Sequence, residues 1–149
     1  SVCGEFATTM DILPTFAQLA GGSAPTDRVI DGHDILPLMT GAAGAVSPYD
    51  VFYYYAQDRL QAVRSGKWKL RLAGPLKQED IYRKFEQPDA PFPEALFNLE
   101  TDVGEQRDLL RDHPDVAERL RGLAEKMRAE LGDALTGVVG TGIRAAGTV

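Results

Sequence analysis

The sequence has very few of the residues that build disulfides and metal sites. Its 149 residues include one cysteine, Cys3, and two histidines, His33 and His113. A single cysteine excludes an internal disulfide and any metal site held by several thiolates. A compact unit of this length buries about 68–70% of its unfolded surface. We therefore expect an apolar core, rather than covalent or metal crosslinks, to hold the fold.

Positive charge and long apolar runs are also scarce. Sixteen lysines and arginines stand against 22 acidic residues, which gives a net charge of −6 and excludes nucleic acid as an expected partner. The longest apolar run, Val51–Ala56, is far shorter than the roughly 20 residues of a membrane span. The first residues contain neither a signal peptide nor an initiator methionine. We expect a chain cut from a longer one, with no membrane span.

The first third of the chain predicts one helix followed by a loop-rich stretch. Hydroxyl and carboxylate groups of Thr8–Asp11 suit a helix start, and Gly21-Gly22 ends the helical spacing that follows. Beyond this point we expect loops as far as Pro48, with a single helical turn at Asp34–Met39.

The next part changes to the two-residue period of β-strands. Four strands are predicted, at Val51–Ala56, Leu60–Ser65, Trp68–Leu72 and Ala95–Leu99. A polar, proline-containing connection at Gly74–Glu94 separates the last two. In the third strand, one face is expected to be buried and the other wet: Trp68, Leu70 and Leu72 against Lys67, Lys69 and Arg71.

The last elements are helical. Asp102 and Glu105 have capping-box spacing, which predicts a short helix to Leu110. A long amphipathic helix should follow from Pro114 and end at Gly132, with an apolar stripe of Val116, Leu120, Leu123, Met127 and Leu131. The class is α+β: a four-stranded antiparallel sheet covered by the carboxy-terminal helix. We divide the chain into residues 1–48, 49–132 and a Gly-rich tail, 133–149, whose last 13 residues are expected to be poorly ordered.

No residue is assigned a catalytic, cofactor-binding or metal-binding role from its pattern. His33, in Asp31-Gly32-His33-Asp34, is typical of turn chemistry rather than of a metal site. His113 stands at a helix start, where capping or solvation is expected, and Cys3 lacks a neighbouring base or cation that would activate it.

The remaining candidates are aromatic and basic residues of the strands. Tyr53 and Tyr55 should share one face of their strand and Tyr54 the other, so core packing is favoured over a sugar or aryl pocket. Arg59, Arg64 and Lys67 have the charge to hold an anion, but basic residues on a wet strand face usually only solvate it.

Four short motifs, in this order, resemble the carboxy-terminal part of the sulfatase family. They are Met10–Thr15 with Leu19–Gly21, then Asp31–Ile35 with Pro37-Leu38 and Gly41, then Ala62–Leu70, and finally Leu96–Leu99 with Asp102, Glu105 and Asp108-Leu109. Val103 and Asp108 depart from the usual proline and asparagine. Each motif alone is weakly specific, whereas the ordered set is strongly specific.

The resemblance implies that residues 1–48 end a large α/β sulfatase domain and that the rest forms its small terminal domain. It also implies a parent enzyme that cleaves sulfate esters with a formylglycine nucleophile, made from Cys or Ser in C/S-x-P-x-R, and a divalent cation, usually calcium. Cys3 is followed by Gly4, Glu5, Phe6 and Ala7, so that motif is missing here. The partners implied are the rest of the parent and, through it, the sulfate ester.

Two alternatives remain open from the residues alone. One is the terminal part of a related phosphonate or phosphate-ester hydrolase, and the other is a free-standing small binding domain. The Tyr53–Arg59 turn is the one segment suggested for the rim of a substrate cleft. The family includes periplasmic, secreted and cytoplasmic members, so the compartment is left open.

Overall fold

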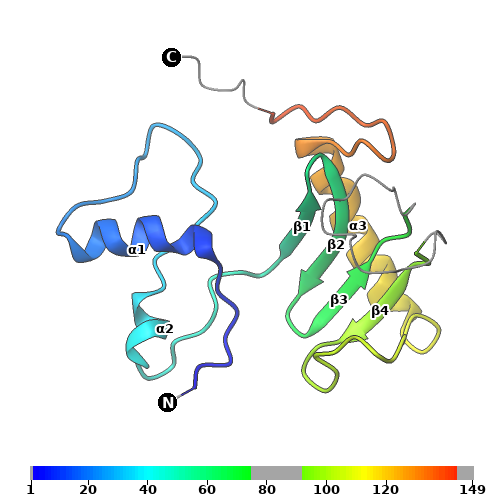
Figure 1. Ribbon diagram of the computed structural model, residues 1–149, viewed down its shortest axis with the longest axis horizontal. Coiled ribbons are helices and arrows are strands. Elements are labelled where there is room, and N and C mark those ends of the chain that lie inside the picture. The colour runs from blue at the N-terminus through cyan, green and yellow to red at the C-terminus, as the bar shows by residue number, and fades with distance from the viewer. Residues whose placement is uncertain (1, 75–91, 144–149) are drawn as a thin grey trace, which may run out of the picture. The chain divides into compact units, whose positions relative to one another are not determined.

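The chain forms two compact units, Ser1–Asp50 and Val51–Val149 (Figure 1). The computed structural model describes residues 2–74 and 92–143, so most of the Gly74–Glu94 connection lies outside the described residues. None of the helices in the described ranges combines the length and the apolar character that crossing a membrane requires.

The second unit is built on an antiparallel sheet whose strands follow one another in space as in sequence. Its order is β1-β2-β3-β4, and each neighbouring pair is antiparallel, as predicted. Alternating β-branched, aromatic and aliphatic residues suit a pleated surface with one face buried. The strands are β1 (Phe52–Ala56), β2 (Arg59–Ser65), β3 (Trp68–Arg71) and β4 (Ala95–Asn98).

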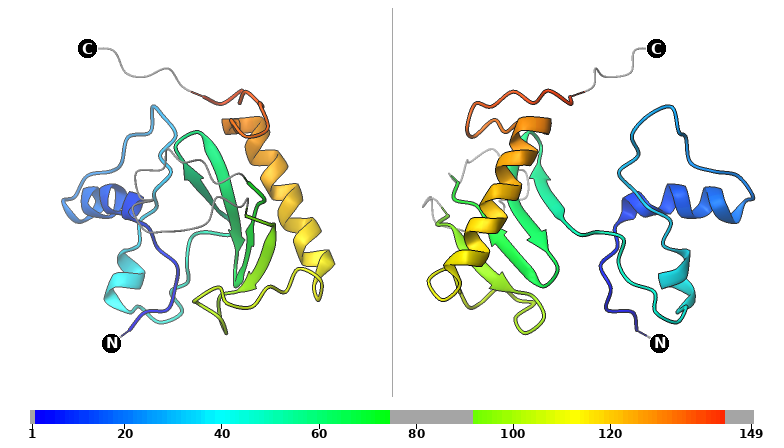
Figure 2. Two further views of the ribbon diagram at one scale, coloured as in Figure 1. Left: turned by 45° about the vertical axis from the view of Figure 1, so that its right-hand side comes forward. Right: turned by 180° about the vertical axis from the view of Figure 1, so that it is seen from behind.

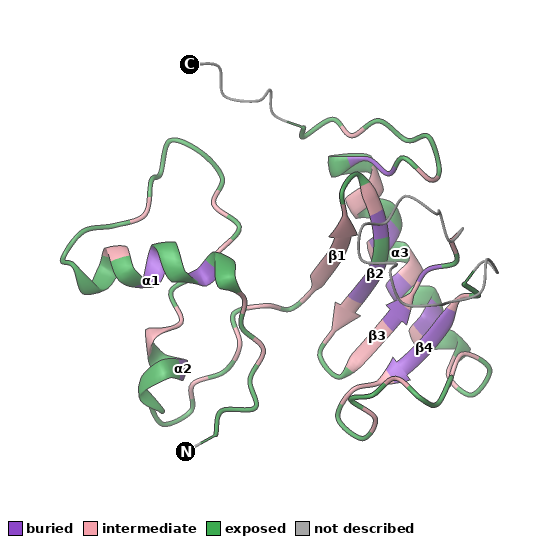
Figure 3. Cartoon of the chain, viewed as in Figure 1, coloured by how far each residue is buried: buried purple, intermediate pink, exposed green. Residues whose placement is uncertain are grey.

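Helix α3 (Pro114–Leu131) lies across one face of this sheet (Figure 2). Pro114 suits its first turn because that position needs no N–H donor. The core lies between helix and sheet and contains Leu60, Val63, Leu70, Leu72, Leu96, Ala117, Leu120 and Ala124. Leu60, Val63, Leu70 and Leu96 line this layer from β2, β3 and β4, whereas Ala62, Ala95 and Phe97 are buried outside it; Figure 3 shows the buried parts of these strands in purple.

The apolar stripe of α3 includes most of the predicted large residues and, in addition, two alanines that were not predicted. Ala117, Leu120 and Ala124 are fully buried, whereas Leu131 is 44% exposed. Alanine has no side chain beyond Cβ, so two alanines on one face allow the helix to approach the sheet closely. Of the predicted stripe, Leu120 is buried and Val116 and Leu123 pack against the core, so the prediction is wrong mainly at the exposed Leu131.

Two further predictions fail in the loops. Residues 102–110 form turns rather than a short helix, because Asp102 accepts from the N–H groups of Gln106 and Arg107, at 3.1 and 2.8 Å. Glu105 has a φ of 54° and does not reach back to close a capping box. Its carboxylate instead lies 2.5 Å from Nζ of Lys69, so Lys69 is not on a freely wet face.

The segment after α3 is also better held than its glycine content predicts. The N–H groups of Thr141 and Gly142 donate to the carbonyls of Ala129 and Glu130, at 3.1 and 2.7 Å. Asp133 and Val138 form an antiparallel bridge. The expectation of a poorly ordered tail from Gly137 is therefore wrong as far as Gly142.

The first unit consists of a 3-10 turn, Thr9–Asp11, and two short helices, α1 (Ile12–Leu19) and α2 (Leu36–Thr40). Loops join them, and Gly41 ends α2 with a φ of 66°, in the left-handed region that glycine tolerates. Most side chains of this unit are exposed (Figure 3). Its organisation therefore depends on polar contacts, described next.

Candidate functional site

The strongest polar cluster of the first unit surrounds the carboxylate of Asp11, which is fully buried. It accepts from the N–H of Thr8 at 2.6 Å, from the N–H of His33 at 2.8 Å and from the hydroxyl of Tyr49. We call these four residues the Asp11 hub. It joins three segments that lie up to 41 residues apart.

The hub explains the Asp31-Gly32-His33-Asp34 motif as turn chemistry. A Cβ at Gly32 would overlap the carbonyl group of Met10, so this loop crosses the helix start where only glycine fits. Thr15 holds the same loop, since its hydroxyl accepts from the N–H of Ile35 at 3.0 Å. His33 contributes its backbone to the hub, and its ring lies edge-on to Tyr49 at 4.8 Å.

The hub shifts the ionisation of both its acid and its phenol. Burial opposes the charge of Asp11, but the hydrogen bonds from Tyr49, His33 and Thr8 outweigh it and hold the pKa below its ordinary value. Burial and the bond to Asp11 raise the pKa of Tyr49 to about 12. An ionised acid with a neutral phenol bonded to it holds segments together; it does not activate a nucleophile at neutral pH.

Burial also raises the pKa of Tyr53 and Tyr55, but alkaline titration should identify Tyr49 by its step near pH 12. Phenolate absorbance should show a step near pH 12, well above the ordinary pKa of 10, and Tyr49→Phe should remove it. Because this folded pKa is raised, the stability that it reflects is complete below pH 10 and is lost as the pH rises toward 12. The prediction fails if Tyr49→Phe leaves the last step of the titration unchanged.

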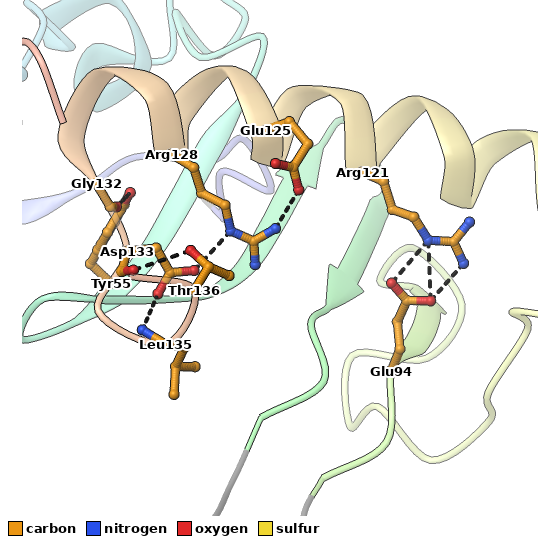
Figure 4. Close-up of polar contacts among 9 residues, drawn as sticks. All are labelled: Tyr55, Glu94, Arg121, Glu125, Arg128, Gly132, Asp133, Leu135 and Thr136. Atoms are coloured by element: carbon orange, nitrogen blue, oxygen red, sulfur yellow. Dashed lines mark hydrogen bonds and ion pairs between the residues drawn. The ribbon is translucent and has the colours of Figure 1, made fainter. Parts of the chain in front are cut away.

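A second polar cluster connects the end of α3 to the β1–β2 hairpin (Figure 4). Nε of Arg128 lies 2.8 Å from Oδ2 of Asp133, whose side chain is fully buried. The hydroxyl of Tyr55 donates to the carbonyl of Gly132 at 2.8 Å, and the N–H of Ala134 donates to the carbonyl of Asp58 at 2.9 Å. These contacts fix the hairpin, so their function is positional.

Arg121 and Glu94 form a third polar contact, near the start of β4 (Figure 4). Two nitrogens of Arg121 meet the carboxylate of Glu94 in a forked arrangement, with distances from 2.6 to 3.2 Å. Such paired bonds fix direction as well as charge. They attach the helix to the strand that follows the connection.

Each of the sequence candidates lies in its own local environment. Cys3 is exposed with a free thiol, and the ring of His113 lies against Trp68 at 4.8 Å, far along the chain from His33. Across residues 2–74 and 92–143, no group of three or more His, Cys, Asp and Glu side chains could hold a metal.

The aromatic and basic candidates have structural partners. Tyr53 and Tyr55 pack against the core, whereas the ring of Tyr54 lies on the other face with Nζ of Lys69 4.7 Å above it, which confirms the predicted alternation. The three basic residues for which solvation was favoured over anion binding each contact a group of this chain: Arg59 contacts Asp58, Arg64 the carbonyl of Gly66, and Lys67 Glu100.

Comparison with known proteins gives a consistent result. The family described as the C-terminal region of aryl-sulfatase matches residues 47–138. An arylsulfatase of Hemicentrotus pulcherrimus is 33% identical over 87% of this chain and 27% of its own length. Arylsulfatase D of Homo sapiens is 35% identical over 74% of this chain and 21% of its own.

A solved structure supports the same fold. A sulfatase from Pseudoalteromonas sp. superposes with a TM-score of 0.62 at 18% identity, over 84% of this chain and 26% of that one. The chain thus spans about a quarter of the length of the proteins that it matches.

Proposed function

Because this chain belongs to the sulfatase family, as its carboxy-terminal region, we propose that it is the structural end of an enzyme that hydrolyses sulfate esters. The family resemblance assigns the nucleophile, a formylglycine, and the divalent cation to residues outside this chain. Hydrolysis needs a nucleophile at sulfur and positive charge to offset the developing negative charge. The residues of this chain would stabilise the parent's fold around the nucleophile and the cation, without taking part in the reaction.

The observation that carries the proposal is the character of helix α1. Its eight residues, ILPTFAQL, carry no charge and include only two polar side chains. Ile12, Leu13, Phe16 and Leu19 are nevertheless 50–55% exposed. A helix that is apolar nearly all round is typical of a protein interior.

The rest of the first unit cannot provide that interior. Its buried residues are Asp11, Pro14, Thr15 and Leu38, which is too few for an independent core. The Asp11 hub fixes the path of the chain, but it leaves α1 uncovered. We infer that the preceding part of the parent polypeptide covers α1, so that the first unit completes the parent's large domain.

Activity measurements test the assignment. The purified 149-residue chain, with added calcium, should hydrolyse neither an aryl sulfate nor an aryl phosphate above the buffer blank. The parent, with its upstream C/S-x-P-x-R motif converted to formylglycine, should turn over the sulfate. Preferential turnover of a phosphonate or phosphate ester by the parent would favour the related hydrolases instead.

Matched variants of α1 test the structural role. In the parent, Phe16→Lys should greatly reduce folded yield and activity together, because a charge would enter an apolar interior. Gln18→Lys, at a position that is already polar, should leave both nearly unchanged. Steady hydrolysis by the isolated chain that Cys3→Ala or His33→Ala abolishes would overturn the proposal.

A further inference from the structure

The two edge strands of the sheet in the second unit differ in how their outer backbone groups are covered. At the β4 edge, the N–H of Leu96 donates to Oδ1 of Asp108 at 3.0 Å, and its carbonyl accepts from the N–H of Leu109 at 2.8 Å. The segment at Asp108-Leu109 therefore covers the outer side of β4. This contact satisfies backbone groups that would otherwise be open to another strand.

At the opposite edge, the part of the chain that the structure describes provides no such cover. We call the outer backbone side of Tyr53–Ala56 the β1 edge. Among the described residues, the backbone of this segment pairs with β2 alone. It also lacks the charged residues and prolines that usually protect an exposed edge.

The side chains of the segment are already used on both faces. Tyr53 and Tyr55 pack on the core, and Tyr54 lies beneath Nζ of Lys69. The hydroxyl of Tyr55 is bonded to Gly132, so the strand is fixed in place. What remains available is a preformed row of backbone donors and acceptors, which is the surface that another β-strand recognises.

Chain connectivity indicates where that strand comes from. Tyr49, which is bonded to Asp11, precedes Tyr53 by four residues, or at most about 14 Å of extended chain. The polypeptide that covers α1 is therefore within reach of the β1 edge. A second copy of this chain is less suitable, since each copy carries a net charge of −6 and the two would repel.

We propose that the β1 edge pairs with an extended segment from the preceding part of the same parent polypeptide, which extends the four-stranded sheet by one strand. The proposal rests on the proposed function, because it requires a parent. Pairing within one polypeptide also benefits from a high effective concentration. The added strand would connect the large domain to the small one through backbone hydrogen bonds.

Residue-resolved amide hydrogen exchange tests this pairing. In the 149-residue chain, the outward N–H groups of Tyr53–Ala56 should exchange rapidly, and in the parent they should slow by about 100-fold or more. The N–H of Leu96 is the internal control, since Asp108 already accepts it and it should be slow in both proteins. Sedimentation of the same sample measures whether the 149-residue chain is monomeric when these rates are recorded.

Three results would overturn the proposal. The first is that the outward N–H groups of Tyr53–Ala56 still exchange rapidly in the folded parent. The second is that they already exchange slowly in the monomeric 149-residue chain. The third is that their exchange slows as that chain dimerises, in which case a second copy pairs with the β1 edge. Sulfate-ester hydrolysis is measured on the same parent sample. Fast edge amides in an active parent would refute only the pairing, whereas slowed amides in an inactive parent would refute only the enzymatic assignment.

Discussion

Replacing Leu70 with aspartate should abolish folding of the Val51–Val149 unit. Leu70 is fully buried at the centre of the sheet, paired with Val63 on one side and Leu96 on the other. A carboxylate placed there would have no partner, and burying it costs several kcal/mol, about as much as the 5–15 kcal/mol that stabilises a typical domain. Circular dichroism and a urea titration of the variant measure the loss.

The matched control introduces a carboxylate at a solvent-exposed position of the same sheet. Gln61 is exposed on β2, so Gln61→Asp should change the free energy of unfolding by less than about 1 kcal/mol. Lys69→Asp is a poor control, because it would place a second carboxylate beside Glu105. If Leu70→Asp and Gln61→Asp lowered the free energy of unfolding equally, the assignment of the buried face would be wrong.

Removing the guanidinium of Arg128 should have the second-largest effect. Arg128→Met would leave the fully buried carboxylate of Asp133 without its ionic partner, and breaking a buried pair in this way costs about 3–5 kcal/mol. Burial opposes the charge of Arg128, but its bonds to Asp133 and Glu125 raise its pKa, so the guanidinium stays charged at neutral pH. The midpoint of urea unfolding measures the cost.

Two further variants isolate this interaction. Glu125 is the exposed partner of Arg128, with 67% of its side chain in solvent, so Glu125→Ala should cost little. Asp133→Asn in the Arg128→Met background should recover part of the lost stability, because a neutral amide leaves no uncompensated charge. If Arg128→Met lowers the free energy of unfolding no more than Glu125→Ala does, the buried Arg128–Asp133 pair contributes little to stability.

Local patterns were sufficient to predict the sheet and the long helix of the second unit. The two-residue period at Trp68–Leu72 and the apolar spacing along Pro114–Leu131 each report on one element, and the sheet and helix that they predict are confirmed. Predictions failed where a distant partner decided the outcome. Glu105 has the spacing of a capping box, but Lys69, 36 residues earlier, takes its carboxylate.

The polar clusters were harder to predict for the same reason. Thr8 and Asp11 carry a visible helix-start signal, and the capping box there is present. Nothing near Asp11 in the sequence indicates Tyr49, which lies 38 residues later and completes the hub. Likewise, alternation places Tyr55 on the core face, but no local pattern indicates that its hydroxyl bonds to Gly132.

The bond between Tyr55 and Gly132 also has a consequence for biosynthesis. The strands pair in sequence order, so a growing chain can assemble the sheet as it leaves the ribosome. The carbonyl of Gly132, which accepts from the hydroxyl of Tyr55, lies 77 residues later in the chain. The hydrogen bond to the carbonyl of Asp58 likewise forms only after Ala134 has been synthesised. A premature stop codon before Gly132 would therefore release a sheet whose hairpin is unanchored, and such a product should be degraded rather than retained as a shorter protein.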